Sequence, residues 1–546
     1  MSSHDIAEVE WQFDVLDLEP VRRWLTDSGA DGGEYSVAAA GTHVQSDTYL
    51  DTEDQRFSRA GFALRVRRLG RRRGAEATLK AIDSTPTKVS GLRSRREVSE
   101  QLDDADPALV ARAGGPVGQR VRAVAGRKPL LPLFEVRTRR EVLKLQTTGS
   151  AGGEIALDET AIRPANGSPA ARFQRVEIEI PESALAGIEA FVTELRAHCA
   201  LQPAGLSKYE AGLLSAGITR PAPERFGPTE VGPGVTIREV ALAVLRRQFS
   251  AMLAKEPGTR LGDDIEELHD MRVASRRLRA ALALFEAVLP ETILGLKDEL
   301  AWIGGQLGAV RDLDVQLEQL ESWIDAAAPE DRDPLRALRS VLEAQRADAR
   351  GEMLEALESR RYDSLVRRFG RTLRARHATR SGAASLPALA VAPDLIDARW
   401  TSVRKASKHL GRSATAADYH RLRIRCKRFR YALEFLTDVY AGRARPVLKR
   451  LVALQDLLGL HQDAVVAIER LRALTAQRGS ELGPETIFAM GEIAERYRQS
   501  VVELRKQVPP AYEGVSGKRW ISFRESIEAQ RPAPEVPVAT APTSSI

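Results

Sequence analysis

The chain has 546 residues, of which 29% are charged and 43% apolar, so its length and composition predict about two to four ordinary globular domains. The net charge of +6 is the small difference between 81 basic and 75 acidic residues. Two cysteines are too few for a disulfide framework, and we see neither a secretory signal nor an apolar run of about 18 residues that would span a membrane. We therefore expect a soluble cytoplasmic protein.

Residues 1–216 contain short segments in which apolar and polar residues alternate, separated by turn residues, and this pattern predicts β-strands. Seven segments qualify, and residues 43–51 make an eighth candidate. The seven are 8–13, 62–69, 76–82, 91–99, 134–142, 153–160 and 175–180.

The polar faces of these strands carry both signs of charge at high density. Examples are Glu8 with Glu10, Arg65 with Arg67, and the row Glu135, Arg137, Arg139 and Glu141. In an open sheet such faces would be solvated. In a closed barrel one set of residues points inward, and a lumen with both carboxylates and Arg or Lys suits a phosphate chain accompanied by divalent metal.

In this region the sequence resembles the CYTH family, the triphosphate tunnel metalloenzymes, over roughly residues 6 to 216. The resemblance rests on several short motifs that follow in order along the chain. They are Glu8-x-Glu10, Tyr49-x-Asp51-Thr52, Leu64-Arg65-Val66-Arg67, Leu79-Lys80, Arg95-x-Glu97, Asp158, Glu177-x-Glu179 and the segment SKYEAG with Lys208.

The resemblance implies an eight-stranded antiparallel barrel with a central tunnel, flanking helices, and metal-dependent chemistry with Mg²⁺ or Mn²⁺ at a triphosphate. By resemblance the metal ligands are Glu8, Glu10, Asp158, Glu177 and Glu179. The triphosphate contacts are Arg65, Arg67, Lys80, Arg95, Arg137, Arg139 and Lys208. Catalysis is assigned to Glu8, Glu10, Lys80 and Arg95.

Two positions depart from the family pattern. The family opens with Glu-x-Glu-x-Lys, and here Gln12 takes the place of the Lys. The late strand often has a further acidic residue where this chain has Arg175. Loss of a cation that touches phosphate weakens stabilisation of the transition state, although Gln12 can still donate a neutral hydrogen bond. We therefore expect reduced or redirected activity, unless the remaining cations compensate.

A linker rich in Pro and Gly is predicted at residues 217–234, and the remaining pattern is helical from 235 to 522. This half is duplicated: HDMRVASRRLRAALALF from His269 matches HRLRIRCKRFRYALEFL from His420, at an offset of 151 residues. LGAVRDLDV from Leu307 matches LGLHQDAVV from Leu458 at the same offset. Residues 529–546, rich in Pro, Ala, Ser and Thr, predict a disordered tail.

Each of the two matched helices concentrates basic residues opposite an apolar face. A cationic face on one helix is often simply solvated, but the same face in both copies predicts a shared anion site. The residues are His269, Arg272, Arg276, Arg277 and Arg279 in the first copy, and His420, Arg423, Lys427, Arg428 and Arg430 in the second. The two histidines add charge when bound to phosphate if they titrate near neutral pH.

This half resembles the CHAD family, the conserved histidine α-helical domain, over roughly residues 233 to 520. The resemblance rests on the two His-x-x-Arg helices and on the two later Leu-Gly segments. It implies two four-helix bundles with pseudo-two-fold symmetry and a basic surface that binds inorganic polyphosphate.

Together these patterns favour a metal-dependent hydrolase of inorganic triphosphate or related phosphate chains, with a helical domain that binds polyphosphate. The alternative is a polyphosphate-binding or targeting protein whose barrel has little or no activity. Binding of nucleic acid ranks lower, because aromatic residues are only 5% and the basic helices lack stacking side chains. The sequence does not specify the preferred substrate, the metal or the oligomeric state.

Overall fold

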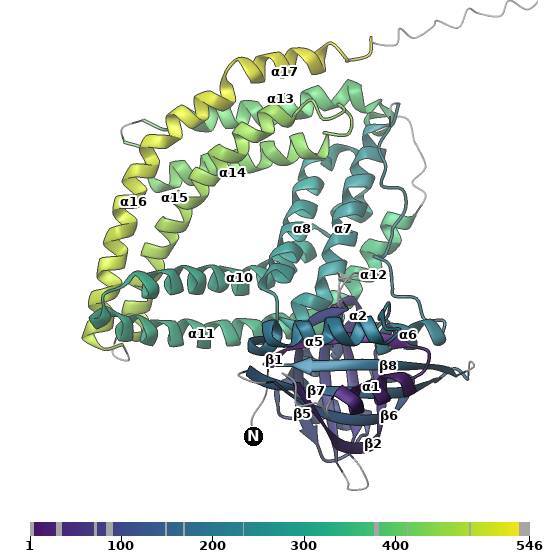
Figure 1. Ribbon diagram of the computed structural model, residues 1–546. Helices are drawn as coiled ribbons and strands as arrows, with labels where there is room; N and C mark the ends of the chain where they lie inside the picture. The colour runs from purple at the N-terminus through teal and green to yellow at the C-terminus, as the bar shows by residue number, and fades with distance from the viewer. Residues whose placement is uncertain are drawn as a thin grey trace, which may run out of the picture. The chain divides into compact units, whose positions relative to one another are not determined.

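The computed structural model describes residues 5–28, 35–69, 74–82, 91–147, 150–167, 170–232, 234–375, 382–411, 413–479 and 482–533. The chain divides into two compact units. The first comprises Met1–Glu224 with Ala254–Glu267, and the second comprises Arg225–Leu253 with Leu268–Ile546 (Figure 1). Each unit is described by itself below.

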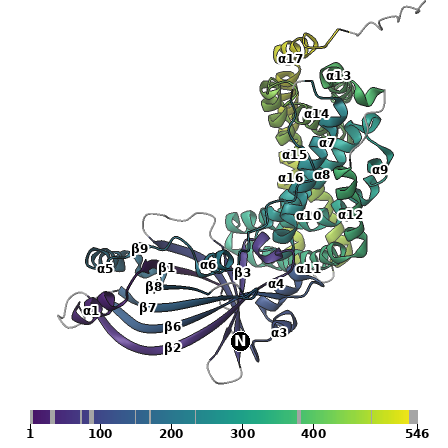
Figure 2. The ribbon, with the colours of Figure 1, turned by 90° about the vertical axis from the view of Figure 1, so that its right-hand side faces the viewer.

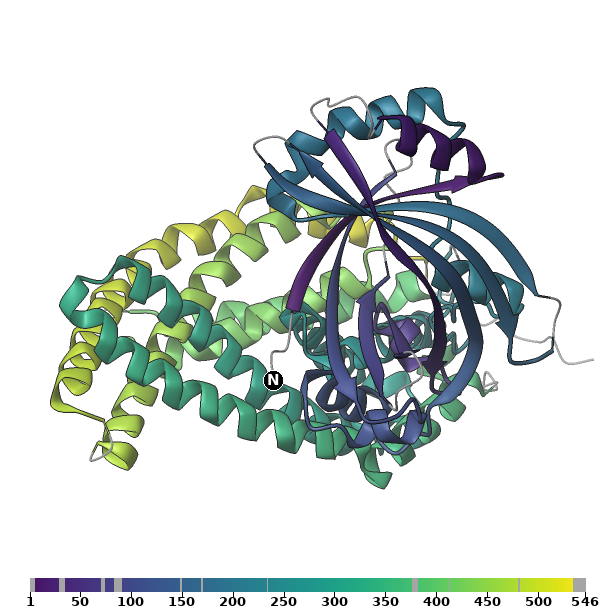
Figure 3. The same ribbon diagram turned by 60° about the horizontal axis from the view of Figure 1, so that its bottom comes forward.

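The first unit is built on one antiparallel sheet that closes on itself. Its strand order is β5-β4-β3-β2-β6-β7-β8-β1, and β1 also pairs with β5, so the eight strands form the predicted barrel (Figure 3). The short strand β9 pairs with β1 outside this ring. The strands are β1 Asp5–Val15, β2 Tyr35–Asp51, β3 Phe62–Arg68, β4 Ala75–Ala81, β5 Leu92–Leu102, β6 Leu131–Thr147, β7 Ser150–Pro164, β8 Ala171–Ile180 and β9 Gln202–Pro203.

Apolar side chains on the outer face of the barrel are covered by helices. Val9, Trp11 and Phe13 of β1 are buried with residues of α1 (Glu19–Ser28) and α5 (Leu185–His198), which lie beside the curved strands in Figure 2. On another side, β3, β4 and β5 pack against α3 (Pro107–Arg112) and α4 (Pro116–Ala125). Full burial of one such apolar side chain contributes about 1.5 to 3 kcal/mol. Strand alternation then turns the polar faces inward.

The row Glu135, Arg137, Arg139 and Glu141 shares one face of β6 as predicted, but this face does not point into the barrel. Arg137 and Arg139 are exposed on the outer face, and Arg139 pairs with Glu159 at 3.2 Å. The inward residues of β6 include the buried Phe134 and Val136, which pack with α6 (Lys208–Ser215), followed along the strand by Arg140. The prediction assumed that the polar face of every strand points inward, but the inner face of β6 mixes apolar residues with one arginine.

The second unit is built from helices, with one isolated β-bridge between Thr236 and Pro387 in its described residues. Each half supplies four long helices, and α10 with α11 and α15 with α16 run side by side in Figure 1. The first half has α7 Ile237–Leu261, α8 Ile265–Leu284, α9 Glu291–Leu294, α10 Lys297–Ala326, α11 Pro329–Glu358 and α12 Arg360–Arg374. The second half has α13 Ala388–Ser407, α14 Ala416–Phe435, α15 Arg445–Arg478, α16 Pro484–Ser516 and α17 Lys518–Glu528.

The helix boundaries repeat with the offset seen in the sequence. Helices α7 and α13 begin at residues 237 and 388, and α8 and α14 begin at residues 265 and 416; both pairs are 151 residues apart. The apolar faces predicted for α8 and α14 are buried. Those buried side chains are Met271, Leu278, Leu282 and Phe285 in the first copy, and Leu422, Phe429, Leu433 and Leu436 in the second.

Helix α15 is long and apolar enough to span a membrane by length and composition alone, with a mean hydropathy of 1.3 over its best window. Core helices of soluble proteins pass the same test, and Leu451, Leu454 and Leu458 of α15 are buried in the helical core. Of the predicted disordered tail, residues 529–533 are described, and Arg531 pairs with Asp394 there at 2.8 Å. Residues 534–546 lie outside the described residues.

Candidate functional site

The inward faces of β1 to β6 and β8, together with the start of α6, enclose a cavity of about 250 Å³ inside the barrel. Most of its wall is charged. The cations are Arg65, Arg67, Lys80, Arg95, Arg140 and Lys208, and the carboxylates are Glu10, Glu76, Glu97, Glu177 and Glu179. The structure therefore brings together most residues of the predicted barrel site.

One group of paired charges lies on β2 to β5. Arg67 donates two hydrogen bonds to Asp47, at 2.8 and 2.9 Å, and Arg65 donates to Glu97 at 3.4 Å. Burial opposes the charge of Arg65, but Asp47 and Glu97 outweigh it and raise its pKa. Burial likewise acts to raise the pKa of Asp47, but the hydrogen bond from Arg67 and the charge of Arg65 lower it overall. Both arginines are therefore held charged within reach of the cavity.

A second group lies on β6, β7, β8 and α6. Asp158 is fully buried, and it accepts two hydrogen bonds from Arg140, at 2.8 and 2.7 Å, and one from Lys208 at 2.6 Å. Glu177 pairs with the same two cations, with Lys208 at 3.0 Å. Burial acts to raise the pKa of Glu177, but Lys208, Arg140 and Arg175 hold it well below its usual value. Asp158 thus fixes two cations at the wall rather than lining the cavity itself.

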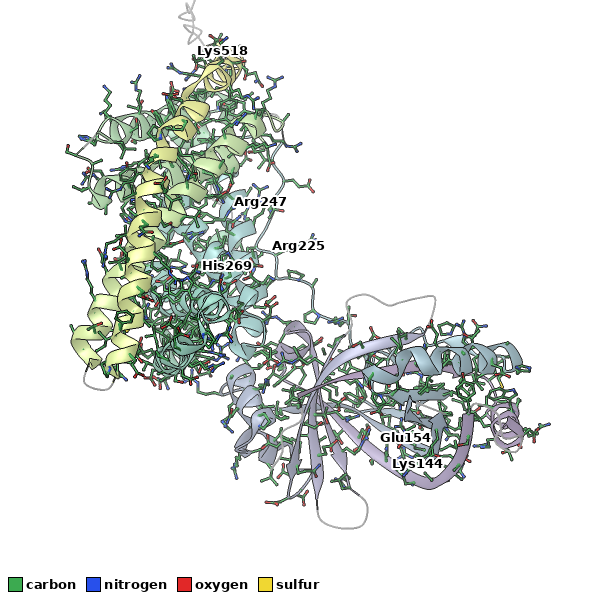
Figure 4. The ribbon with its side chains drawn as sticks, turned by 60° about the vertical axis from the view of Figure 1, so that its left-hand side comes forward. Lys144, Glu154, Arg225, Arg247, His269 and Lys518 are labelled. Carbon is green, nitrogen blue, oxygen red and sulfur yellow. The ribbon has the colours of Figure 1, made fainter. Side chains whose placement is uncertain are left out.

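Glu10 and Glu179 form the carboxylate pair best placed for a cation. They lie opposite each other on β1 and β8, and both line the cavity. Burial, then repulsion by Glu10 and Glu154, raise the pKa of Glu179. Glu154 itself lies beside Lys144 on the neighbouring strand (Figure 4). No hydrogen bond or ion pair joins Glu179 to another described residue, so its charge lacks a partner within the described chain.

This carboxylate pair fits a hard divalent cation, which prefers oxygen ligands from one or two carboxylates plus water and phosphate. Among the side chains that the structure describes, no cluster of three His, Cys, Asp or Glu side chains is arranged around a metal position. The backbone of Glu8 lies in β1 opposite Arg95, but its side chain lies outside the described residues.

Gln12 is buried at the cavity wall beside Glu10. Its side-chain amide donates to Glu10 Oε1 at 2.8 Å, which leaves Gln12 Oε1 buried without a hydrogen-bond partner among the described residues. Lys80 approaches the same carboxylate oxygen at 3.5 Å. A neutral amide therefore occupies a position next to a carboxylate in the cavity wall.

Asp51, in the motif Tyr49-x-Asp51-Thr52, supports the structure rather than lining the cavity. It accepts hydrogen bonds from the backbone N–H groups of Thr52, Phe57 and Ser58, at 2.7, 3.0 and 3.0 Å, and so holds the turn that leads into α2 (Arg56–Arg59). Burial raises its pKa to about 6 despite these bonds.

The sequence analysis missed Arg140. Arg139 and Arg140 are consecutive on β6, and the alternation of polar residues favoured Arg139 as the phosphate contact. The signal that could have identified Arg140 is Val136, since a buried apolar residue four positions earlier shares its face. Glu76 and Glu97 also line the cavity, although the sequence analysis assigned a role to neither.

A second cavity, of about 400 Å³, lies in the helical unit and combines the two repeats. Arg276 comes from α8, Arg423, Lys427 and Arg430 from α14, and Asp456 and Asp463 from α15. We call it the basic groove. Arg276 of the first repeat therefore lies at one site with Arg423, Lys427 and Arg430 of the second.

Lys427 lies at the centre of the charge in the groove. Burial, followed by the charges of Arg276, Arg423, Arg272 and Arg430, lowers the pKa of Lys427 to about 7. No hydrogen bond or ion pair joins Arg423 or Lys427 to another described residue. Repulsion between Lys427 and the neighbouring arginines costs free energy that a bound anion would remove.

The other predicted groove residues lie around it with partners of their own. Arg272 pairs with Asp312 at 2.9 Å, Arg277 with Glu434 at 2.9 Å, and His420 contacts Gln462 at 2.6 Å. Arg279 and Arg428 are exposed. His269 lies half-buried on α8 (Figure 4) and does not line the groove.

Comparison with known proteins finds two families along the chain: a CYTH domain matches residues 25–212, and a CHAD domain matches residues 243–472. An uncharacterized protein of Mycobacterium tuberculosis (strain CDC 1551 / Oshkosh) is 28% identical over 545 residues, covering 91% of this chain and 96% of that protein. The predicted order of a CYTH domain followed by a CHAD domain is confirmed.

Two solved structures are similar to separate parts of the chain. The CHAD domain from the plant Ricinus communis is 29% identical with a TM-score of 0.39, covering 56% of this chain and 97% of that one. An adenylyl cyclase candidate from Hippeastrum with a dominant triphosphatase activity is 19% identical with a TM-score of 0.28, covering 39% of this chain and 98% of that one.

Proposed function

We propose that this chain, a CYTH domain followed by a CHAD domain, is a metal-dependent hydrolase of inorganic triphosphate or related phosphate chains whose helical unit binds inorganic polyphosphate. The CYTH family contains triphosphatases and cyclases and is typically metal-dependent. The observation that carries the proposal is the charged cavity inside the barrel, whose wall intersperses cations with carboxylates.

The balance of charge in the cavity supports a requirement for metal. Six cations line it, against five carboxylates, and the buried Asp47 and Asp158 pair with the cations from behind. The described wall thus carries no surplus of positive charge to offset a phosphate chain with several negative charges. A divalent metal held by Glu10 and Glu179 would supply the missing positive charge.

Each group has a defined task in this proposal. Arg65, Arg67, Arg140 and Lys208, kept in place by buried carboxylates, would bind phosphate oxygens and orient the chain. When bound, the metal supplies a Lewis acid at the phosphoryl oxygens and lowers the pKa of water. Lys80, between Glu10 and Glu97, would meet charge that develops on the leaving phosphate.

The test is release of phosphate from tripolyphosphate by the full chain with Mg²⁺ or Mn²⁺, comparing wild type with Glu8→Ala and Glu177→Ala. We expect metal-dependent release that both substitutions reduce by at least about 100-fold. A pure wild-type protein that releases no phosphate with either metal would contradict the enzyme proposal.

Polyphosphate binding by the helical unit is supported by a separate observation, the basic groove. Arg423 and Lys427 lack partners among the described residues, and the low pKa of Lys427 reflects burial among four arginines. The same groove supports the alternative of a binding protein with a weak barrel, which Gln12 favours. Competition between polyphosphate and duplex DNA for the full chain tests the choice of polyanion, and we expect polyphosphate to displace DNA.

A further inference from the structure

The segment that delivers Lys208 to the barrel cavity is tied through its backbone to β1 before α6 begins. It begins at β9, which pairs with β1, and the N–H of Ala204 then donates to the carbonyl of Gln12 at 2.9 Å. Ser207 caps α6 through a reciprocal capping box with Glu210. Lys208 follows as the first residue of the helix.

Two buried arginines hold the carbonyl groups of this segment. Arg93 of β5 is 8% exposed, and its Nη2 donates to the carbonyl of Ala204 at 2.6 Å. Arg175 of β8 is 2% exposed, and its Nη2 donates to the carbonyl of Leu206 at 2.7 Å. The Arg175 Nε also donates to Asp14 at 2.9 Å, which ties the contact to β1.

Burial of a guanidinium group is costly unless each charge is paired and hydrogen-bonded. A barrel wall at such a position can be packed with apolar residues, as it is at Phe173, two residues earlier on the same face of β8. The two arginines instead use charge-assisted hydrogen bonds to fix backbone carbonyls four and two residues before Lys208. A carbonyl held in this way sets the path of the backbone directly.

The position of Lys208 matters because its ammonium group contacts the buried Asp158 and the cavity carboxylate Glu177 at once. Its Nζ lies 2.6 Å from Asp158 and 3.0 Å from Glu177. A shift of about 1 Å in the start of α6 would break this geometry and weaken the charge-assisted contact of Lys208 with a bound phosphate.

We propose that Arg93 and Arg175 are positioning residues that hold the segment Gln202–Ser207 so that Lys208 reaches the phosphate chain in the barrel cavity. The inference rests on the proposed function of the barrel. It assigns a role to Arg175, where the sequence departs from the family pattern.

The first test is a double-mutant cycle on tripolyphosphate hydrolysis by the full chain with Mg²⁺. We expect Lys208→Ala and Arg175→Met each to raise KM about tenfold with a smaller change in kcat, because each removes a charge-assisted contact. If Arg175 acts through Lys208, the double variant has the KM of Lys208→Ala alone. A KM that is the product of the two single effects would overturn the proposal.

Two further variants and a measurement of thermal stability distinguish positioning of Lys208 from a general loss of structure. Arg175→Lys should restore part of the affinity, since a lysine can still donate to the Leu206 carbonyl. Arg172→Met, at an exposed arginine of the same strand, is the matched control and should leave KM unchanged. If the single variants change thermal stability but not KM, the two arginines are structural and the proposal is wrong.

Hydrogen exchange of the full chain makes the test independent of activity. In Arg93→Met and Arg175→Met we expect faster exchange in a peptide covering residues 202–209, with the strands on either side unchanged. Unchanged exchange there would contradict the proposal even in an active enzyme. If wild type releases no phosphate while exchange rises as expected, the proposed reaction fails and the positioning of Lys208 stands.

Discussion

The barrel cavity and the basic groove both gather cations, but they differ in how those cations are paired. In the cavity, Arg67 and Lys208 contact buried carboxylates at 3.0 Å or less, and the wall as a whole is close to neutral. In the groove, Arg423 and Lys427 have no partner among the described residues. A paired cation is oriented and rigid, whereas an unpaired one is available for an anion that arrives without metal.

The pairing of the cations indicates the role of each site. Paired charges suit a reaction site, where donors must be fixed before the substrate arrives and where metal completes the balance. Unpaired charges suit capture, since long-range attraction and release of counterions supply the affinity. The predictions below test this comparison, from the largest expected effect to the smallest.

The largest effect is expected from removing the cations in and beside the basic groove. Replacing Arg272, Arg276, Arg423 and Lys427 together by Ala should weaken polyphosphate binding at least about 100-fold at low salt. The slope of log affinity against log salt should also fall by about three, since each phosphate contact contributes about 0.7 to 0.9. Fluorescence anisotropy with labelled polyphosphate at several salt concentrations measures both quantities.

The matched control for that variant removes four exposed arginines from one helix of the same unit. Arg360, Arg367, Arg368 and Arg371 of α12 are exposed, so their replacement by Ala changes the net charge equally. We expect little change in affinity from the control. Equal losses in the two variants would show that total charge, not the groove, determines binding.

The next effect tests which face of β6 belongs to the cavity. Arg140→Met should lower kcat/KM for tripolyphosphate about 100-fold or more, because it leaves Asp158 and Glu177 with a single cation. Arg139→Met removes only an exposed pair with Glu159 and should stay within about twofold of wild type. Steady-state kinetics measure both variants. A greater loss of kcat/KM in Arg139→Met than in Arg140→Met would show that the face of Arg139 lines the cavity.

The third effect concerns pH. In the free groove the pKa of Lys427 is about 7, below its ordinary 10.5, and a bound anion favours the charged amine and raises that pKa. Binding therefore takes up a proton, and polyphosphate affinity should fall as pH rises from 7 to 9, by up to about tenfold per unit. Lys427→Arg keeps its charge and should flatten this dependence.

Calorimetry in buffers of different ionisation enthalpy measures the proton uptake of this third prediction. A wild-type affinity that is independent of pH between 7 and 9 would show that Lys427 does not contact the anion.

The smallest effect is expected at Gln12. Gln12→Lys places a cation beside Glu10, where a neutral amide now donates at 2.8 Å, and should raise turnover of tripolyphosphate a few-fold. The initial rate at saturating substrate is the measurement. Unchanged or lower turnover would mean that Lys80 and its neighbours already provide the charge.

Particular residues show how far the sequence predicted the site. Strand alternation placed Glu10, Arg65, Lys80 and Glu177 correctly, because each of those strands has a clear apolar face for the outer helices to cover. On β6 the consecutive Arg139 and Arg140 made the phase ambiguous, and only the packing of α6 against Phe134 settles it.

The roles of Arg175 and of the basic groove needed the fold. Arg175 was visible as a departure from the family pattern, but its contact with the Leu206 carbonyl joins residues 31 positions apart. In the groove, the repeat predicted that Arg276 and Lys427 share a site, yet the same pattern included His269, which lies elsewhere on its helix. The periodicity of the sequence predicts which residues share one face of a helix. Which residues of two helices line the same groove depends on tertiary packing.

The most direct test of the comparison is triphosphate binding to the full chain in which Arg272, Arg276, Arg423 and Lys427 are Ala, measured by calorimetry with excess EDTA and then with Mg²⁺. With the groove removed, the near-neutral barrel cavity should bind triphosphate only in the presence of Mg²⁺. Binding of equal affinity in EDTA would contradict the account, because the paired cations of the barrel would then suffice without metal.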